Sequence, residues 1–195
     1  MNRSDMSAAE RIQHRREHAV DPESFLLDAG IVQSTDEKTE LAFDPTFIDQ
    51  VLNEFARLDR EGVDQELLAE LFEVDEDDVE RADKPYLAYK IIFTVRSWSS
   101  EEALTLDLAT HVALRSTTDG WMDVPARQRY SILRSLRLFH EECPSCSARL
   151  AIGDEPVQSC CHDRQVLTLD CTGCGRRFAE LSTEKGSEIT VESGS

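Results

Sequence analysis

Two pairs of cysteines limit what the last third of this chain can fold into. Cys143 and Cys146 are separated by two residues, Cys171 and Cys174 repeat that spacing, and 24 residues lie between the pairs. A two-residue gap allows one tight turn to direct both sulfurs toward a common point, and two such turns complete a tetrahedron of thiolates with Zn–S distances of about 2.3 Å. The pattern predicts one structural Zn²⁺ with no open coordination position.

The distribution of the cysteines favours metal binding over the alternative of unrelated buried or disulfide-bonded thiols. All six cysteines lie in the last 53 residues, and disulfides are disfavoured in a reducing cytosol. Cys160 and Cys161 are neighbours on an expected strand, so their side chains point to opposite faces. We interpret them as small buried apolar residues, with a substituted ligand or a redox-sensitive thiol as the alternative. His140 and His162 are less favoured ligand candidates.

The segment 141–182 resembles the zinc-ribbon family. Its two C-x-x-C turns look like the two knuckles of that family, and Gly175 supplies the tight turn after the second, whereas Ser147 stands where glycine is common after the first. From Cys143 onward the apolar residues follow a period of two, which predicts two or three short antiparallel strands. Zinc ribbons occur in transcription factors, polymerase subunits, ribosomal proteins and adaptors, so the resemblance implies a fold more than a role.

The residues before the ribbon show apolar spacings of three and four, which predict helices. The expected helices occupy residues 22 to about 29, 45 to about 61, two short stretches within 65–83, 86–98, about 101–118 and 124–142. The stretch 86–98 is apolar on nearly all sides, and we interpret it as the central buried helix of a bundle. The predicted fold class is α+β. Its expected parts are a mobile arm (1–20), a helical domain (21–142), a small antiparallel β zinc ribbon (143–182) and a disordered tail (183–195).

Residues 67–79 resemble the helix-turn-helix family. The apolar residues at the positions where that family packs its two helices are Ala69, Phe72, Val74 and Val79. The resemblance implies a winged-helix-like start of the helical domain and binding to DNA. However, Glu73 stands at the usual turn glycine, and the second helix would present five acidic residues, which repel phosphates and the acceptor edges of guanine. We therefore favour a structural helical hairpin over a DNA-reading element.

The chain is strongly acidic, with 39 acidic against 21 basic residues and a net charge of −18. Only four of the basic residues are lysines, and the acidic residues are spread over the helical positions. This composition resembles that of proteins from salt-in halophilic archaea, which implies adaptation to a high-salt cytosol. No apolar run is long enough to span a bilayer, and the first 20 residues lack a secretory core. We expect a cytoplasmic protein that does not contact membranes.

Arginines provide the one local excess of positive charge. Residues 125–142 carry four arginines against two glutamates, and Arg127, Arg134 and Arg137 are expected on the outside of the last helix. Together with Arg176 and Arg177 of the ribbon they predict a basic face for nucleic acid or an acidic partner. The alternative is an ordinary solvated helix face.

The sequence contains no phosphate-binding loop, nucleophile elbow or metalloprotease motif. Asp107 and His111 lie one helical turn apart, and we interpret them as a surface pair that stabilises a helix. We therefore expect a non-enzymatic zinc-ribbon regulatory or adaptor protein that makes macromolecular contacts, with a protein partner and with nucleic acid as a further candidate. The alternatives are a DNA-binding transcriptional regulator and an enzyme with a pocket in the helical domain.

Overall fold

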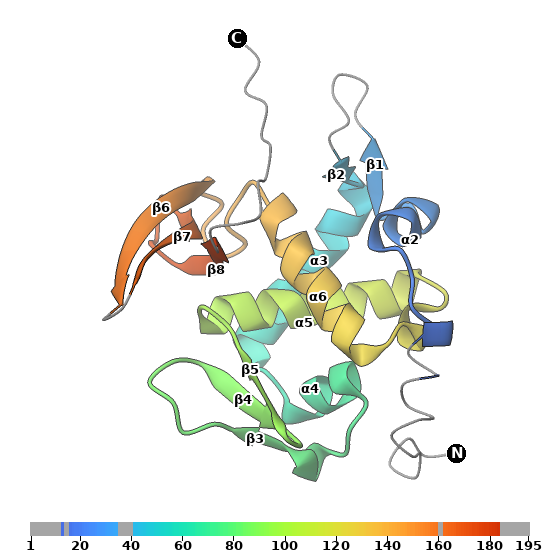
Figure 1. Ribbon diagram of the computed structural model, residues 1–195. Helices are drawn as coiled ribbons and strands as arrows, with labels where there is room; N and C mark the ends of the chain where they lie inside the picture. The colour runs from blue at the N-terminus through green and yellow to red at the C-terminus, as the bar shows by residue number, and fades with distance from the viewer. Residues whose placement is uncertain (1–12, 14–15, 35–40, 160–161, 184–195) are drawn as a thin grey trace.

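The computed structural model describes residue 13 and residues 16–34, 41–159 and 162–183 (Figure 1). Most of the expected arm (1–20), nearly all of the expected tail (183–195), and Cys160 and Cys161 lie outside this part of the chain. Among the residues that are described, no helix is long and apolar enough to cross a membrane.

Five α-helices form the first two thirds of the described chain. They are α2 (Pro22–Asp28), α3 (Pro45–Glu61), α4 (Gln65–Phe72), α5 (Glu101–Thr117) and α6 (Ala126–Leu136). The helix starts follow the local sequence: the Asp44 carboxylate accepts the N–H groups of Thr46 and Phe47 at the start of α3, and Ser100 Oγ accepts the Ala103 N–H at the start of α5. Short 3₁₀ segments are η2 (Glu76–Asp78), η3 (Trp121–Asp123) and η4 (Arg137–Phe139).

The strands form three antiparallel sheets. They are β1 (Val32–Ser34) with β2 (Leu41–Phe43), then β3 (Val79–Arg81), β4 (Ala88–Ile91) and β5 (Thr94–Ser97), and finally β6 (Leu150–Ser159), β7 (His162–Cys171) and β8 (Arg177–Thr183). In the last sheet β7 lies between β6 and β8, with Ile152 opposite Leu169 and Leu169 opposite Ala179. The expected α+β class, with a C-terminal part built from strands, is confirmed.

The prediction of a central helix at 86–98 is wrong, because this segment forms the β4–β5 hairpin. Its β-branched and aromatic residues favour strands. The segment is apolar on nearly all sides because some of its apolar side chains pack inward and others remain exposed. The central helix is α5 instead, which passes through the middle of the helical region (Figure 1) and buries eleven of its residues.

The second helix predicted within 65–83 is also wrong. After α4 the chain forms η2 and then strand β3, so the described residues contain no recognition helix at this place. The residues between Val74 and Val79 are all acidic and offer no apolar face to a second helix. Glu73 occupies the position where the helix-turn-helix family usually has a turn glycine, and it adopts a left-handed conformation with φ of 55°. Its carboxylate lies 2.6 Å from the Arg129 guanidinium.

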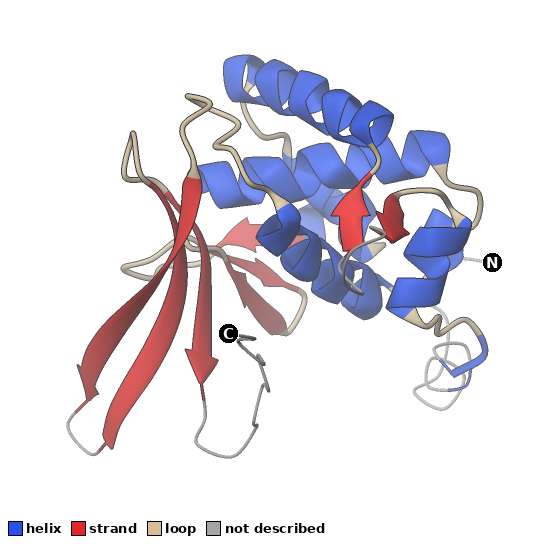
Figure 2. Ribbon diagram, turned by 90° about the horizontal axis from the view of Figure 1, so that it is seen from above, coloured by secondary structure: helices blue, strands red, loops and turns tan. Residues whose placement is uncertain are grey.

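The strands β6, β7 and β8 extend to one side of the helices, and the base of this sheet packs against them (Figure 2). Phe178 of β8 is fully buried and belongs to the same apolar cluster as the helical core. Three polar contacts join the ribbon to the start of α5: Ser99 Oγ and Ser100 Oγ donate to the Arg177 carbonyl at 3.2 and 2.6 Å, and Arg176 pairs with Glu102 at 2.6 Å. The cysteine turns at the base of the sheet therefore lie beside the helical region.

Candidate metal centre

The two C-x-x-C turns have the same backbone hydrogen bonds. In the first, the Cys143 N–H donates to the Ala148 carbonyl at 2.8 Å and the Ser147 N–H to the Cys143 carbonyl at 2.8 Å. In the second, the Cys171 N–H donates to the Arg176 carbonyl at 2.9 Å and the Gly175 N–H to the Cys171 carbonyl at 2.9 Å. Both turns are thus built on one template.

The residue that follows each turn has a left-handed backbone. Gly175 has a φ of +71° and Ser147 a φ of +56°. The serine noted in the sequence therefore occupies a conformation that glycine adopts without the steric penalty of a Cβ. The first turn keeps the geometry of the second at a cost in backbone strain.

The four thiol sulfurs converge. They all lie within 4.8 Å of one another, with 3.8 Å between the sulfurs of Cys143 and Cys174 and 3.4 Å between those of Cys146 and Cys171. A tetrahedral zinc ion with Zn–S bonds of about 2.3 Å separates its sulfurs by about 3.8 Å. The residues therefore fit a metal ion such as zinc, and this is the one such group among the described histidine, cysteine and acidic side chains.

Gly173 allows the two turns to approach each other. A Cβ at this position would lie 2.6 Å from the Cβ of Ala148 and 3.5 Å from Cys146 Sγ, closer than two carbon atoms can pack. The N–H groups of Gly173 and Cys174 also point to Cys171 Sγ, each at 3.4 Å. The second turn thus supplies both the space and the donors that a thiolate needs.

The local environment separates the thiol pKa values. The backbone N–H of Cys174 is the main cause that lowers the pKa of Cys171 to about 6, whereas burial raises the pKa of Cys143 to about 12. A bound metal ion deprotonates its coordinating thiols. In this site a bound ion would deprotonate Cys143, whereas the backbone N–H groups already favour the thiolate form of Cys171.

His140, the other sequence-predicted ligand whose side chain the structure describes, is not part of the cluster. His140 is buried, its ring lies 5.1 Å from that of Phe43, and burial lowers its pKa to about 4. It is a buried polar residue at the end of η4. The side chain of His162 lies outside what the structure describes, as do Cys160 and Cys161.

The expectation that Arg137 lies on the outside is wrong. It is 4% exposed, its Nε lies 2.8 Å from Asp107 Oδ1, and its Nη1 donates to the Phe178 carbonyl at 2.6 Å. Asp107 is fully buried and also accepts the Trp98 Nε1–H at 2.8 Å. Burial raises the pKa of Asp107, and the Arg137 charge opposes that rise. A buried ion pair therefore joins α5, η4 and β8.

The surface pair expected of Asp107 and His111 is wrong as well, because both side chains are buried. His111 Nδ1 accepts the Trp121 Nε1–H at 3.0 Å, which leaves Nε2 facing Glu70 at 3.5 Å. Burial, reinforced by the Arg129 charge, lowers the pKa of His111 to about 4. The two side chains thus belong to separate buried networks.

Of the remaining candidate arginines, two are in ion pairs and two are exposed on α6. Arg176 pairs with Glu102, and Arg177 pairs with Asp170 at 2.9 Å. Arg127 and Arg134 are exposed on α6, and Arg134 lies 5.8 Å from the Tyr130 ring. The ion pairs of the buried arginines escape sequence reasoning because their partners lie tens of residues away along the chain.

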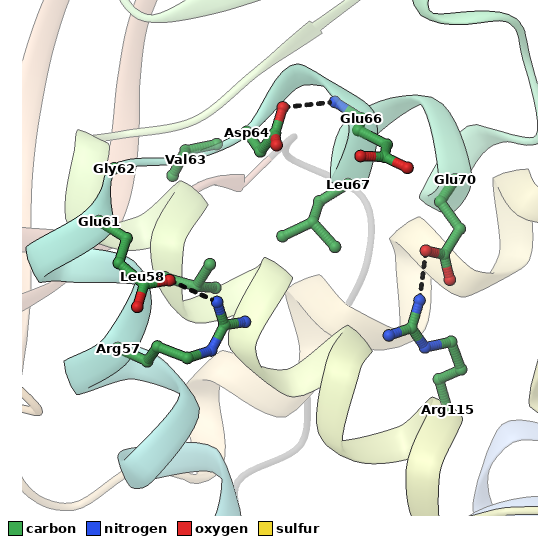
Figure 3. Close-up of a pocket in the computed structure, with 10 residues that line it drawn as sticks. All are labelled: Arg57, Leu58, Glu61, Gly62, Val63, Asp64, Glu66, Leu67, Glu70 and Arg115. Carbon is green, nitrogen blue, oxygen red and sulfur yellow. Dashed lines mark hydrogen bonds and ion pairs between the residues drawn. The ribbon is translucent and has the colours of Figure 1, made fainter.

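A cavity of about 600 Å³ lies between the end of α3, the start of α4 and α5 (Figure 3). It is lined by Arg57, Leu58, Glu61, Gly62, Val63, Asp64, Glu66, Leu67, Glu70 and Arg115. Arg57 pairs with Glu61 at 2.8 Å, Arg115 pairs with Glu70, and Asp64 accepts the Glu66 N–H at 3.0 Å. These charged lining groups therefore form contacts within α3, at the start of α4, and between α4 and α5.

Fold and site together define an α+β protein with a cluster of four cysteines that fits a metal ion. The chain belongs to a family of unknown function, DUF8054: the central domain of this family matches residues 21–138, and its C-terminal domain matches residues 141–181. No curated protein and no solved structure matches the chain.

Proposed function

We propose that the four cysteines bind one structural Zn²⁺ and that the protein is a non-enzymatic regulatory or adaptor protein of a high-salt cytosol, whose ribbon makes macromolecular contacts. The observation that carries the proposal is the convergence of four thiol sulfurs within 4.8 Å. Four thiolates occupy all positions of a tetrahedral ion and leave none for a substrate or a catalytic water. The ion would hold the two turns together, and the chain around it would provide the contacts.

The ribbon sheet offers a surface for such contacts. Ile152 is 75% exposed, and the register places it on the same sheet face as Leu167 and Leu181. Leu181 is itself among the exposed large apolar residues. Exposed apolar side chains on one face of a rigid module are typical of interaction surfaces.

Metal analysis and a pull-down at native salt test the proposal together. We expect one zinc per chain in the purified protein, and less than about half a zinc per chain would contradict the metal site. The same two measurements on the variant Ile152→Ser should show a reduced recovery of partners and an unchanged zinc content. Partners that are recovered equally with wild type and Ile152→Ser would argue against contacts through this face.

The DNA-binding alternative has less support. The segment after α4 is acidic and forms η2 and β3, and three of the five candidate arginines are in ion pairs. An electrophoretic mobility shift in high KCl with one DNA sequence, and not with others, would favour a transcriptional regulator instead. For the enzyme alternative, the cavity beside α4 is the candidate pocket, and its paired charges support a structural role.

A further inference from the structure

The turn of the β4–β5 hairpin has an unusual composition. Ile92 has a φ of +54°, in a connection where two-residue hairpin turns favour glycine or asparagine. A β-branched residue in this conformation is an outlier, and such strain concentrates at functional positions. The chain thus keeps isoleucine and phenylalanine where folding alone would favour small polar residues.

The side chains of this turn are also exposed. Phe93 is 96% exposed, Val95 46% and Ile92 39%, and we refer to these three residues as the hairpin tip. A single exposed apolar residue is ordinary, but three neighbouring ones that include a fully presented phenylalanine form a patch. Buried aromatic side chains are common anchors of protein interfaces.

Acidic residues border the hairpin tip. The Ile92 N–H donates to the Asp78 carbonyl at 2.9 Å, which holds the tip against η2 (Figure 1). The acidic run Asp75 to Asp78 is exposed, and no described basic side chain forms an ion pair with it. The nearby cations have other partners, because Lys90 pairs with Glu80 and Arg81 with Glu101.

We propose that the hairpin tip is a docking surface, and that Phe93 inserts into an apolar pocket rimmed by lysine and arginine side chains on a partner protein. The acidic border complements such a rim. Nucleic acid and anionic lipid would be repelled by the same border, and a second copy of the chain would bring two acidic borders together. At high salt the apolar insertion is strengthened while long-range charge effects are screened.

This surface lies outside the zinc site and adds a second contact to the proposed function. The inference does not require zinc, so it can fail while the metal site stands, or hold if the ribbon makes no contact. The exposed Leu52 of α3 is a control, because it is an exposed large apolar side chain that belongs neither to the hairpin tip nor to the ribbon face.

Photo-crosslinking in the native cells tests the proposal. The full chain would carry a photoreactive phenylalanine analogue at position 93, and the protein joined to it would be identified and purified. Its dissociation constant would then be measured against wild type, Phe93→Ser, and Leu52→Ser. We expect Phe93→Ser to weaken binding about tenfold or more and Leu52→Ser to leave the affinity within about twofold.

Charge reversal tests the nature of the partner surface. The double change Glu76→Lys and Asp77→Lys should weaken binding severalfold in low salt and less in molar KCl. Equal affinity of wild type and Phe93→Ser, or no protein adduct from position 93, would overturn the proposal. So would Phe93-dependent dimers in sedimentation, or Phe93-dependent binding to vesicles of phosphatidylcholine and phosphatidylglycerol. Circular dichroism and zinc content confirm that each variant is folded.

Discussion

The helical region and the ribbon are stabilised by different means. The helical region buries large apolar side chains from four helices, among them Phe55, Leu68, Leu104 and Leu133. In the described part of the ribbon the buried apolar residues and cysteines are Cys143, Leu150, Val166, Leu169, Cys171, Phe178 and Ala179. Modules of about 40 residues rarely bury enough surface to fold alone and usually need a metal or disulfides. The helical region can rely on its core, whereas we expect the ribbon to depend on its four thiols.

The two regions nevertheless share a boundary that is partly polar. Arg137 is buried between Asp107 of α5 and the carbonyl of Phe178 in β8. Phe178 itself belongs to the apolar cluster of the helices. Loss of the ribbon should therefore weaken the helical region without unfolding it.

Removal of one thiol tests the contrast most strongly. We expect Cys171→Ser to abolish zinc binding, with about 10–16 kcal/mol of binding free energy at stake, and to unfold β6–β8. Amide hydrogen exchange should show loss of protection in the ribbon while α5 remains protected. Thr172→Ser, in the same turn, keeps the hydroxyl that donates to the Arg149 carbonyl and should bind zinc normally. Simultaneous loss of protection in α5 and the ribbon would show that the two regions unfold as one unit.

The buried ion pair at the boundary is the next test. Arg137→Met keeps most of the side-chain volume but leaves the Asp107 carboxylate buried without its cation, and this should lower the free energy of unfolding by about 3–5 kcal/mol. Urea denaturation measures the loss. Adding Asp107→Asn to that variant should recover part of it, because the uncompensated charge is removed.

Arg127→Met is the matched control for Arg137→Met. Arg127 is exposed on α6, the helix that leads into η4, so its replacement should change the free energy of unfolding by less than about 0.5 kcal/mol. Equal effects of the two changes would mean that the ion pair contributes nothing to the boundary.

The cysteine cluster and the buried Arg137 differ in how well the sequence predicts them. The spacing of Cys143, Cys146, Cys171 and Cys174 predicts the geometry of the cluster. Each C-x-x-C turn is formed by residues that are close in sequence, and the two turns have the same backbone hydrogen bonds. The caps of α3 and α5 are local as well. The burial of Arg137 does not follow from the local sequence, because its partners, Asp107 and Phe178, come from distant segments that only the tertiary fold brings together.

The prediction of a helix at 86–98 is wrong for a related reason. An apolar run of this length fits a buried helix or a hairpin equally well, and periodicity does not separate the two. The strained turn at Ile92 is not encoded by glycine or asparagine, so the usual hairpin signal is absent. Both failures concern features that go beyond local sequence preference.

The buried His111 makes the stability of the helical region depend on pH. Its pKa of about 4 in the folded protein lies below the ordinary value of 6.5. Above pH 6.5 the side chain is neutral in both states, but as the pH falls toward 4 only the unfolded chain takes up the proton. From this group alone we expect the free energy of unfolding to decrease by about 2 kcal/mol between pH 7 and pH 5.

His111→Gln isolates this contribution. Glutamine can accept the Trp121 N–H and does not titrate, so the variant should lose less stability than wild type between pH 7 and pH 5. Urea denaturation at both values gives the difference, and other titrating groups cancel in the comparison. Parallel pH profiles for wild type and variant would mean that His111 is protonated to the same extent in the folded and unfolded states.

The smallest test returns to the ribbon and asks whether its backbone limits zinc affinity. Ser147→Gly should relieve the left-handed strain in the first turn, stabilise the zinc-bound ribbon by about 0.5–1 kcal/mol, and tighten zinc binding by two- to fivefold. Competition with a chelator measures the affinity. Gly175→Ser is the converse change at the matching position, where a Cβ meets no atom within 4 Å, so any weakening there reports backbone strain alone. If Ser147→Gly binds zinc no more tightly, the four thiolates set the affinity by themselves, and the contrast with the packing-dependent helical region becomes sharper.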